Sequence, residues 1–320
     1  MTKNNIRICF AHVAYELEKT FNLRNTGIEC NQYWDYESLK LNIKNFEILT
    51  VSGLWDNKLL DYVENLKFIQ SIGAGYDQFD LTALKSRGIK LANASGVNKN
   101  AVSEHAISMI LAFTRLLHHA RDNQKQHHWR PLISDSTIRE DELEQKTILL
   151  IGLGKIGSRI SLLAKAFGMN VIAIRQNPQL GKGTSDEIHS IVDLEKLIPR
   201  ADFLVLACPL TKETKSIVNS SLIKKMKKSS YLINVARGGC VNEEDLYSAL
   251  KNHEIAGAGI DHFNKDPLPK NSLFWDLDNI IITPHSGGET RMYEENLIDI
   301  LLENLNILST GNKNLINGVI

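Results

Sequence analysis

The sequence predicts an α/β protein with two doubly wound parallel-sheet domains, the second inserted into the first. Short apolar runs alternate with helical patterns along most of the chain, which is typical of parallel βα units. A helix-compatible stretch at residues 101–126 separates an early series of these units from a later one, and a last helical pattern at residues 289–310 follows both. We therefore expect residues 1–97 and 289–320 to form the first domain and residues 98–288 to form the inserted domain.

The apolar runs give the expected strands in chain order. In the first domain they are Ile6–Phe10, Phe46–Val51, Phe68–Ile72 and Ile89–Ala92. In the inserted domain they are Thr147–Ile151, Val171–Ile174, Phe203–Ala207, Tyr231–Val235, Gly257–Ile260 and Ile280–Ile282. Between the two series, residues 101–126 carry apolar side chains at helical spacing, so we expect one long helix there. The 320 residues, 43% of them hydrophobic, suffice for two domains with a core each.

Charge and cysteine usage argue against a nucleic-acid-binding protein, a membrane protein and a disulfide-linked secreted protein. The chain has 37 basic and 37 acidic residues, so no long-range field favours nucleic acid or an anionic membrane. The four cysteines, Cys9, Cys30, Cys208 and Cys240, lack Cys-x-x-Cys spacing and indicate free thiols in a reducing compartment. Neither a signal peptide nor an apolar run near the roughly 18 residues of a membrane span is visible. We expect a cytoplasmic protein without a nucleic-acid partner, a membrane partner or a metal site.

A Gly-x-Gly-x-x-Gly turn follows the apolar run that ends at residue 151, and a helical pattern at Ser158–Phe167 continues from it. Gly152 permits a tight turn, Gly154 lets the backbone approach a pyrophosphate, and Gly157 lets the helix pack closely on the strand. The helix N-terminus offers unpaired N–H groups to the phosphates. The turn therefore predicts a dinucleotide site, and the alternative is a glycine-rich turn that binds no ligand.

Arg175 indicates which dinucleotide is bound. It follows the strand expected at Val171–Ile174, 18 positions after Gly157, where an acid that hydrogen-bonds the ribose 2′-hydroxyl is usual. A carboxylate would repel a 2′-phosphate, whereas a guanidinium forms a forked pair with it. We expect NADP(H) to be favoured, with NAD(H) possible. The alternative is a solvated arginine that stacks on the adenine ring.

Six motifs in order along the chain resemble the D-isomer-specific 2-hydroxyacid dehydrogenase family, in its glyoxylate and hydroxypyruvate reductase branch. They are the Gly152 turn and the segments 73–77, 96–106, 209–214, 234–239 and 283–288. The resemblance covers about residues 45 to 310. It implies a Rossmann dinucleotide-binding domain inserted into a flavodoxin-like substrate domain. It also implies a homodimer formed through the long helix at 101–126, although burial against its own domain would explain the apolar positions of that helix equally well.

The same resemblance assigns three catalytic residues. Arg237 matches the catalytic arginine, whose guanidinium forks onto the carboxylate and carbonyl oxygens of a 2-oxo acid. His285 matches the acid/base histidine, which protonates the new alkoxide during reduction. Asp266 stands where the family has a glutamate, and a carboxylate there supports the imidazolium electrostatically. Because aspartate is one methylene shorter, either its loop approaches more closely or the pair is looser.

Further binding residues follow from the resemblance. Backbone N–H groups of Ala74 and Gly75 would bind the substrate carboxylate together with Arg237, unless this segment is a plain strand-to-helix turn. Asp261 would bind the nicotinamide carboxamide. The residues expected at the cofactor are Gly152, Gly154, Lys155, Ile156, Gly157, Arg175, Cys208, Pro209, Thr211, Val235 and Asp261. For the loop residues among them, ordinary strand-end turn chemistry is the alternative.

We therefore expect an NAD(P)-dependent enzyme that reduces a small 2-oxo acid, such as glyoxylate, hydroxypyruvate or pyruvate, to the D-2-hydroxy acid. A phosphoglycerate dehydrogenase-like enzyme is one alternative. A non-enzymatic partner protein that senses NAD(H), similar to corepressors on this fold, is another, because a fold alone does not decide function. The complete set of Arg237, Asp266 and His285 favours catalysis.

Overall fold

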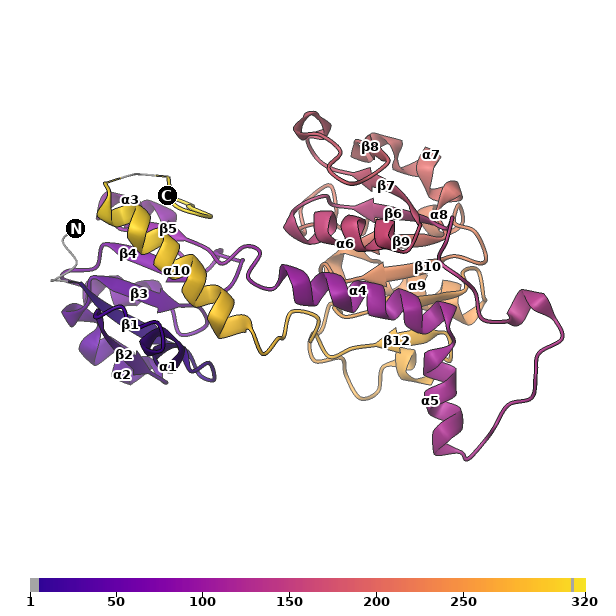
Figure 1. Ribbon diagram of the computed structural model, residues 1–320, viewed down its shortest axis with the longest axis horizontal. Helices are drawn as coiled ribbons and strands as arrows, with labels where there is room; N and C mark the ends of the chain where they lie inside the picture. Colours follow the sequence, from indigo (N-terminus) through magenta and orange to yellow (C-terminus); the bar gives the residue numbers. More distant parts are fainter. Residues whose placement is uncertain (1–5, 312–313) are drawn as a thin grey trace. The chain divides into compact units, whose positions relative to one another are not determined.

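The computed structural model describes residues 6–311 and 314–320, so the first five residues considered for a signal peptide lie outside it. The chain forms two compact units, one of Met1–Asn98 with Thr290–Ile320 and one of Lys99–Glu289 (Figure 1). Each unit contains one parallel sheet, of five and seven strands respectively, so the predicted α/β class with two parallel sheets is confirmed. Among the described residues, no helix has the length and apolarity needed to cross a membrane.

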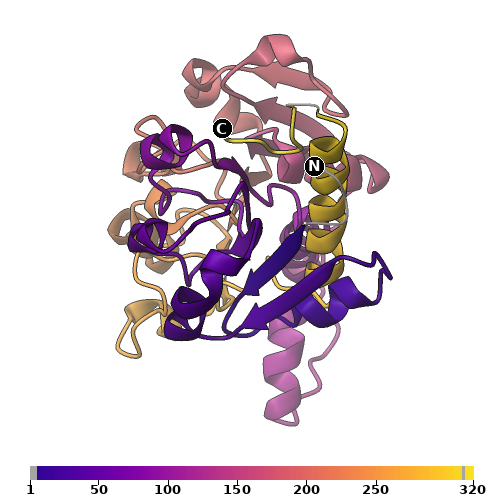
Figure 2. The same cartoon turned by 90° about the vertical axis from the view of Figure 1, so that its left-hand side faces the viewer.

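The first unit has helices on both faces of its sheet, whose order is β2-β1-β3-β4-β5. The strands are β1 (Arg7–Ala11), β2 (Glu29–Tyr33), β3 (Ile48–Val51), β4 (Phe68–Ser71) and β5 (Lys90–Ala92). The helices are α1 (Leu17–Asn22), α2 (Tyr36–Asn42), α3 (Leu81–Ser86) and α10 (Tyr293–Ser309). One core joins the sheet to α1 and α10, and a second core joins the other face to α2 and α3. Figure 2 shows α10, in yellow, along one side of this sheet.

The second unit has a seven-stranded sheet of order β12-β11-β10-β9-β6-β7-β8. The strands are β6 (Thr147–Ile151), β7 (Asn170–Ile174), β8 (Glu187–His189), β9 (Phe203–Leu206), β10 (Tyr231–Asn234), β11 (Gly257–Ile260) and β12 (Ile280–Ile282). The helices are α4 (Lys99–Thr114), α5 (Leu117–Lys125), α6 (Lys155–Ala166), α7 (Leu194–Leu197), α8 (Ser220–Ile223) and α9 (Glu243–Lys251). Helices α4 and α6 cover one face, and α7, α8 and α9 cover the other. The strand order reverses between β6 and β9, and ligands of such sheets bind at that reversal, beyond the carboxyl ends of the strands.

The structure corrects the predicted elements at four places. The helix expected over 101–126 is broken at Leu116, which has a left-handed backbone with φ of 50°, so α4 and α5 are separate helices. Two strands were missed, β2 and β8, which are the edge strands of their sheets and are only partly buried. The last helix begins at Tyr293 rather than at residue 289.

Candidate active site

Two glycines of the turn after β6 are required by its geometry. Gly152 has a φ of +104°, and a Cβ on it would lie 2.5 Å from the carbonyl oxygen of Ala207 at the end of β9. A Cβ on Gly157, in the first turn of α6, would lie 2.0 Å from the carbonyl oxygen of Gly152. Gly154, by contrast, faces open space, because no atom lies within 4 Å of its ideal Cβ position. The turn is therefore tight on its protein side and open beside Gly154, at the N-terminus of α6.

A cavity of about 420 Å³ opens beside this turn, at the reversal of the strand order. Of the predicted cofactor residues, its lining includes Gly152, Gly154, Arg175, Cys208, Pro209 and Thr211. Lys155, Ile156, Gly157, Val235 and Asp261 do not line it. The Arg175 Nη1 donates a hydrogen bond of 3.0 Å to the carbonyl oxygen of Gly181, which holds the guanidinium near the loop that follows β7. Glu213 also lines the cavity, and its carboxylate accepts a hydrogen bond from the Thr211 hydroxyl.

The loop that carries Arg237 is fixed by a buried asparagine at the end of β10. Asn234 is fully buried; its Nδ2 donates to the carbonyl oxygen of Arg237 at 3.1 Å, and its Oδ1 accepts from the Ala236 N–H at 3.0 Å. A Cβ on Gly238 would lie 2.2 Å from the Phe263 carbonyl carbon, so this loop also packs closely on the segment after β11. The Arg237 side chain itself is exposed. The sequence did not point to Asn234, because a polar residue that ends a strand is common.

His285 and Asp266 form a pair, although they come from different loops. The Nδ1 of His285 contacts Oδ2 of Asp266, and both side chains are about half exposed. The shorter aspartate therefore reaches the imidazole. His285 has a left-handed backbone with φ of 54°, two residues after a threonine that continues from β12.

A buried carboxylate fixes the backbone around His285. Asp261, 2% exposed at the end of β11, accepts hydrogen bonds from the Thr283 hydroxyl at 2.6 Å and the Ser286 N–H at 3.0 Å. The Gly287 N–H lies 3.1 Å from its Oδ2. His105 of α4 contributes its Nε2, 2.9 Å from the Thr283 hydroxyl and 3.5 Å from Asp261 Oδ1. The contact of Asp261 with a nicotinamide carboxamide stays a prediction, whereas its role in holding this loop was missed.

The second unit thus collects Arg237, Asp266, Asp261 and His285 on the loops after β10, β11 and β12. These loops lie side by side at the carboxyl ends of the strands, because β10, β11 and β12 are parallel neighbours. Ala74 and Gly75 belong to the first unit, where both are exposed after β4, and the Ala74 carbonyl oxygen accepts from Asn93 Nδ2 at 2.9 Å. Their binding of a substrate carboxylate stays a prediction.

Comparisons with known proteins show which proteins this chain is similar to. A profile described as D-isomer specific 2-hydroxyacid dehydrogenase, NAD binding domain, matches residues 107–287. A glyoxylate reductase of Thermofilum pendens is 33% identical over 275 residues, which cover 84% of this chain and 80% of that protein. A D-3-phosphoglycerate dehydrogenase of Methanocaldococcus jannaschii is 34% identical over 86% of this chain, but the chain spans only 52% of its length. The structure of a D-isomer specific 2-hydroxyacid dehydrogenase family protein from Aeromonas salmonicida matches with a TM-score of 0.84 and 25% identity over 99% of both chains.

The two glycines of α6 and its cap allow a matched test of the turn. We expect Gly157→Ala to lower the free energy of unfolding of the second unit by about 1–3 kcal/mol, because its Cβ would overlap the Gly152 carbonyl oxygen. Gly154→Ala is the control, since its Cβ has open space and its φ is −82°, and it should unfold as the wild type does. Urea unfolding, monitored by circular dichroism, measures the free energy of unfolding of both variants. Equal stability of Gly157→Ala and wild type would contradict the close packing.

Proposed function

The chain belongs to the D-isomer specific 2-hydroxyacid dehydrogenase family, and we propose that it reduces a small 2-oxo acid, of the glyoxylate, hydroxypyruvate or pyruvate type, to the D-2-hydroxy acid with NAD(P)H. The observation that carries the proposal is the contact of His285 with Asp266 at the sheet edge that also presents Arg237. An acid-supported imidazole beside an exposed guanidinium is what reduction of a 2-oxo acid requires.

The cavity beside the glycine turn fits a dinucleotide. The space at Gly154 and the N–H groups that begin α6 would receive a pyrophosphate, and Arg175 would receive the adenosine side. A nicotinamide dinucleotide bound by these residues would supply the hydride. Because Arg175 is a cation at the position where an acid would bind the ribose, we propose that NADP(H) is preferred.

The protein's own groups have separate tasks in this reaction. Arg237 binds the substrate carboxylate and polarises the carbonyl, since its guanidinium stays charged and offers a planar fork of N–H donors. His285 keeps Nδ1 on Asp266, which leaves Nε2 to give a proton to the alkoxide oxygen. Asn234 and Asp261 keep the two loops in place and thereby set the position of both side chains.

A panel of substrates tests the proposal against its alternatives. Glyoxylate, hydroxypyruvate, pyruvate and 3-phosphoglycerate are incubated with the protein and NADP(H) or NAD(H), and the absorbance of the reduced cofactor is followed. We expect turnover of at least one small 2-oxo acid. Turnover of 3-phosphoglycerate alone would favour the phosphoglycerate dehydrogenase alternative. Cofactor binding without any turnover would favour the non-enzymatic partner protein.

Asp266→Asn tests the acid/base pair. The amide keeps the size of the side chain but has no charge to support an imidazolium, so we expect kcat to fall by about 10²-fold and the pH profile of kcat to change. The control is Asp276→Asn, which changes an exposed aspartate of the segment between β11 and β12. Its kcat and the pH profile of kcat should equal those of the wild type. A pH profile that is the same in Asp266→Asn and wild type would remove Asp266 from the mechanism.

Arg175→Gln tests the choice of cofactor. A charged pair with a phosphate contributes about 1.5–3 kcal/mol, so we expect the ratio of kcat/KM for NADPH over NADH to fall by about 10- to 100-fold. Arg200→Gln is the matched control, because Arg200 is bound by Glu187 and does not line the cavity. A wild type that prefers NADH, or an unchanged ratio in Arg175→Gln, would contradict the proposal.

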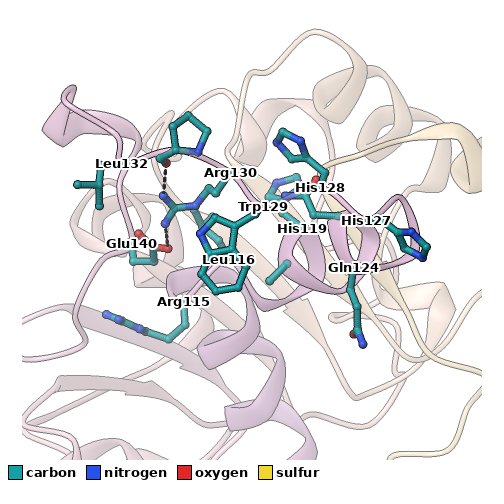
Figure 3. Close-up of a pocket in the computed structure, with 13 residues that line it drawn as sticks. Arg115, Leu116, His119, Gln124, His127, His128, Trp129, Arg130, Leu132 and Glu140 are labelled. Atoms are coloured by element: carbon teal, nitrogen blue, oxygen red, sulfur yellow. Dashed lines mark hydrogen bonds and ion pairs between the residues drawn. The ribbon is translucent and has the colours of Figure 1, made fainter.

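We also propose that two copies of the chain associate through the arm, which we define as α5 with the loop 126–142. Helix α5 buries none of its residues, and Trp129 and Leu132 are 96% and 97% exposed. Figure 3 shows both side chains near Arg130, which is paired with Glu140. These four residues help to line a hollow of about 930 Å³. Two large apolar side chains this exposed on the arm favour a protein partner, and a second copy of the chain offers a self-complementary one.

Light scattering after size-exclusion chromatography tests the association. We expect twice the chain mass for the wild type and one chain mass for Trp129→Glu/Leu132→Glu, because an unpaired carboxylate is costly in an apolar interface. Leu41→Glu, which replaces a 72% exposed leucine of the first unit, is the control and should keep the doubled mass. A wild type of one chain mass would overturn the proposal.

A further inference from the structure

His262 has no role in the mechanism above, yet it contacts two of the residues on which that mechanism depends. It follows Asp261 directly at the end of β11 and is only 8% exposed. Its ring lies against the His285 ring, with centroids 3.8 Å apart and planes inclined by 58°. Its Nε2 lies 3.5 Å from Oδ2 of Asp261. The side chain therefore touches both the imidazole and the buried carboxylate.

Two carboxylates lie near this pair of rings, and the loop gives them different partners. Asp261 Oδ1 accepts from Thr283 and Ser286, and its Oδ2 is next to Gly287 N–H and His262 Nε2. His105 approaches the same carboxylate from α4 at 3.5 Å. Asp266 is the carboxylate that contacts Nδ1 of His285. Asp261 is therefore already occupied by the loop, by His262 and by His105, and Asp266 is the carboxylate that pairs with His285.

The His262 ring is neutral near pH 7. Burial lowers its pKa to about 4, because the charged form would lose its hydration, and the positive charge of His285 and of Arg237 acts in the same direction. Asp261 and Asp266 oppose this shift but do not cancel it. A neutral ring can pack on His285 without adding a second cation beside Arg237.

We propose that His262 is a positioning residue, whose ring packs on His285 and holds that imidazole against Asp266 with Nε2 left for proton transfer. This inference rests on the proposed function and adds to it the residue that fixes the orientation of the acid/base histidine. It assigns no proton transfer to His262 itself.

His262→Ala and His262→Phe separate the packing of the His262 ring on His285 from other effects of replacing the histidine. His262→Ala removes the ring, and we expect kcat to fall about tenfold with KM nearly unchanged, because the imidazole loses its orientation while Arg237 still binds substrate. His262→Phe keeps an aromatic face and should retain most of the wild-type kcat. His253→Asn, at an exposed histidine after α9 that belongs neither to the site nor to the arm, is the control. Wild-type kcat in His262→Ala would overturn the inference, and so would a loss of kcat in a folded His262→Phe as large as in the alanine variant.

A second measurement does not need turnover. The ¹⁵N shifts of the His285 ring, assigned by their loss in His285→Gln, report which nitrogen carries the proton. For the neutral form of the ring, we expect the proton on Nδ1 in wild type and His262→Phe, and shifts averaged between the two tautomers in His262→Ala. Wild-type shifts in His262→Ala would overturn the inference. If the wild type reduces none of the 2-oxo acids, the proposed function fails while the ring shifts still decide the role of His262.

A pH series of unfolding tests the neutral state of the ring. Because the pKa of His262 is about 4 in the folded protein and 6.5 as the ordinary value, the unfolded chain takes up a proton between these limits that the folded chain does not. The wild type should therefore lose stability relative to His262→Phe as pH falls from 6.5 to about 4. The difference between their urea midpoints measures this. A difference that is constant with pH would contradict a neutral buried ring.

Discussion

The buried carboxylate of Asp261 is the constraint on which the site depends. A carboxylate that is 2% exposed is costly unless its oxygens are paired, and here a hydroxyl and backbone N–H groups of the loop after β12 pair them. These bonds tie the end of β11 to the end of β12. They also help to maintain the left-handed backbone of His285, a conformation that costs about 1–3 kcal/mol in a residue other than glycine.

The parallel direction of the strands is a second constraint on the site. Because β10, β11 and β12 run side by side in one direction, residues about 20 to 30 positions apart in sequence meet at one edge. The reversal of strand order between β6 and β9 brings the glycine turn against Ala207 and opens the cavity there. Chemistry and cofactor recognition are thus placed on loops, while strands such as β9 and β11 beneath them are buried along their whole length.

The sequence predicted those strands and helices that have a clear pattern of apolar residues. Central strands such as β6 and β9 are buried on both faces and read as apolar runs, so their positions were correct within a residue or two. The edge strand β2 has one buried residue, Cys30, among exposed and partly buried ones, and β8 has only three residues, so neither gave a clear apolar run. The break at Leu116 was also missed, because a leucine gives no sign of a left-handed backbone.

The motifs predicted which residues belong to the site but not how their side chains meet. Arg237 and His285 stand at strand ends in recognisable segments, and Asp266 was placed by alignment. The contacts of His105 and His262 could not be predicted, since they join α4 and β11 to the loop after β12 across long separations in sequence. Such contacts depend on side-chain packing in three dimensions, and sequence spacing does not encode it.

The hydrogen bond from Arg175 to the Gly181 carbonyl has a consequence for how nucleotide selectivity can change. An arginine that is tethered during folding has already lost much of its rotamer entropy, about 1.5–2 kcal/mol, so an arriving anion does not have to immobilise it. The tether depends on the five residues between the two partners. Insertions or deletions in that loop would release the guanidinium, so loop length, as much as residue type, would govern discrimination between the two coenzymes.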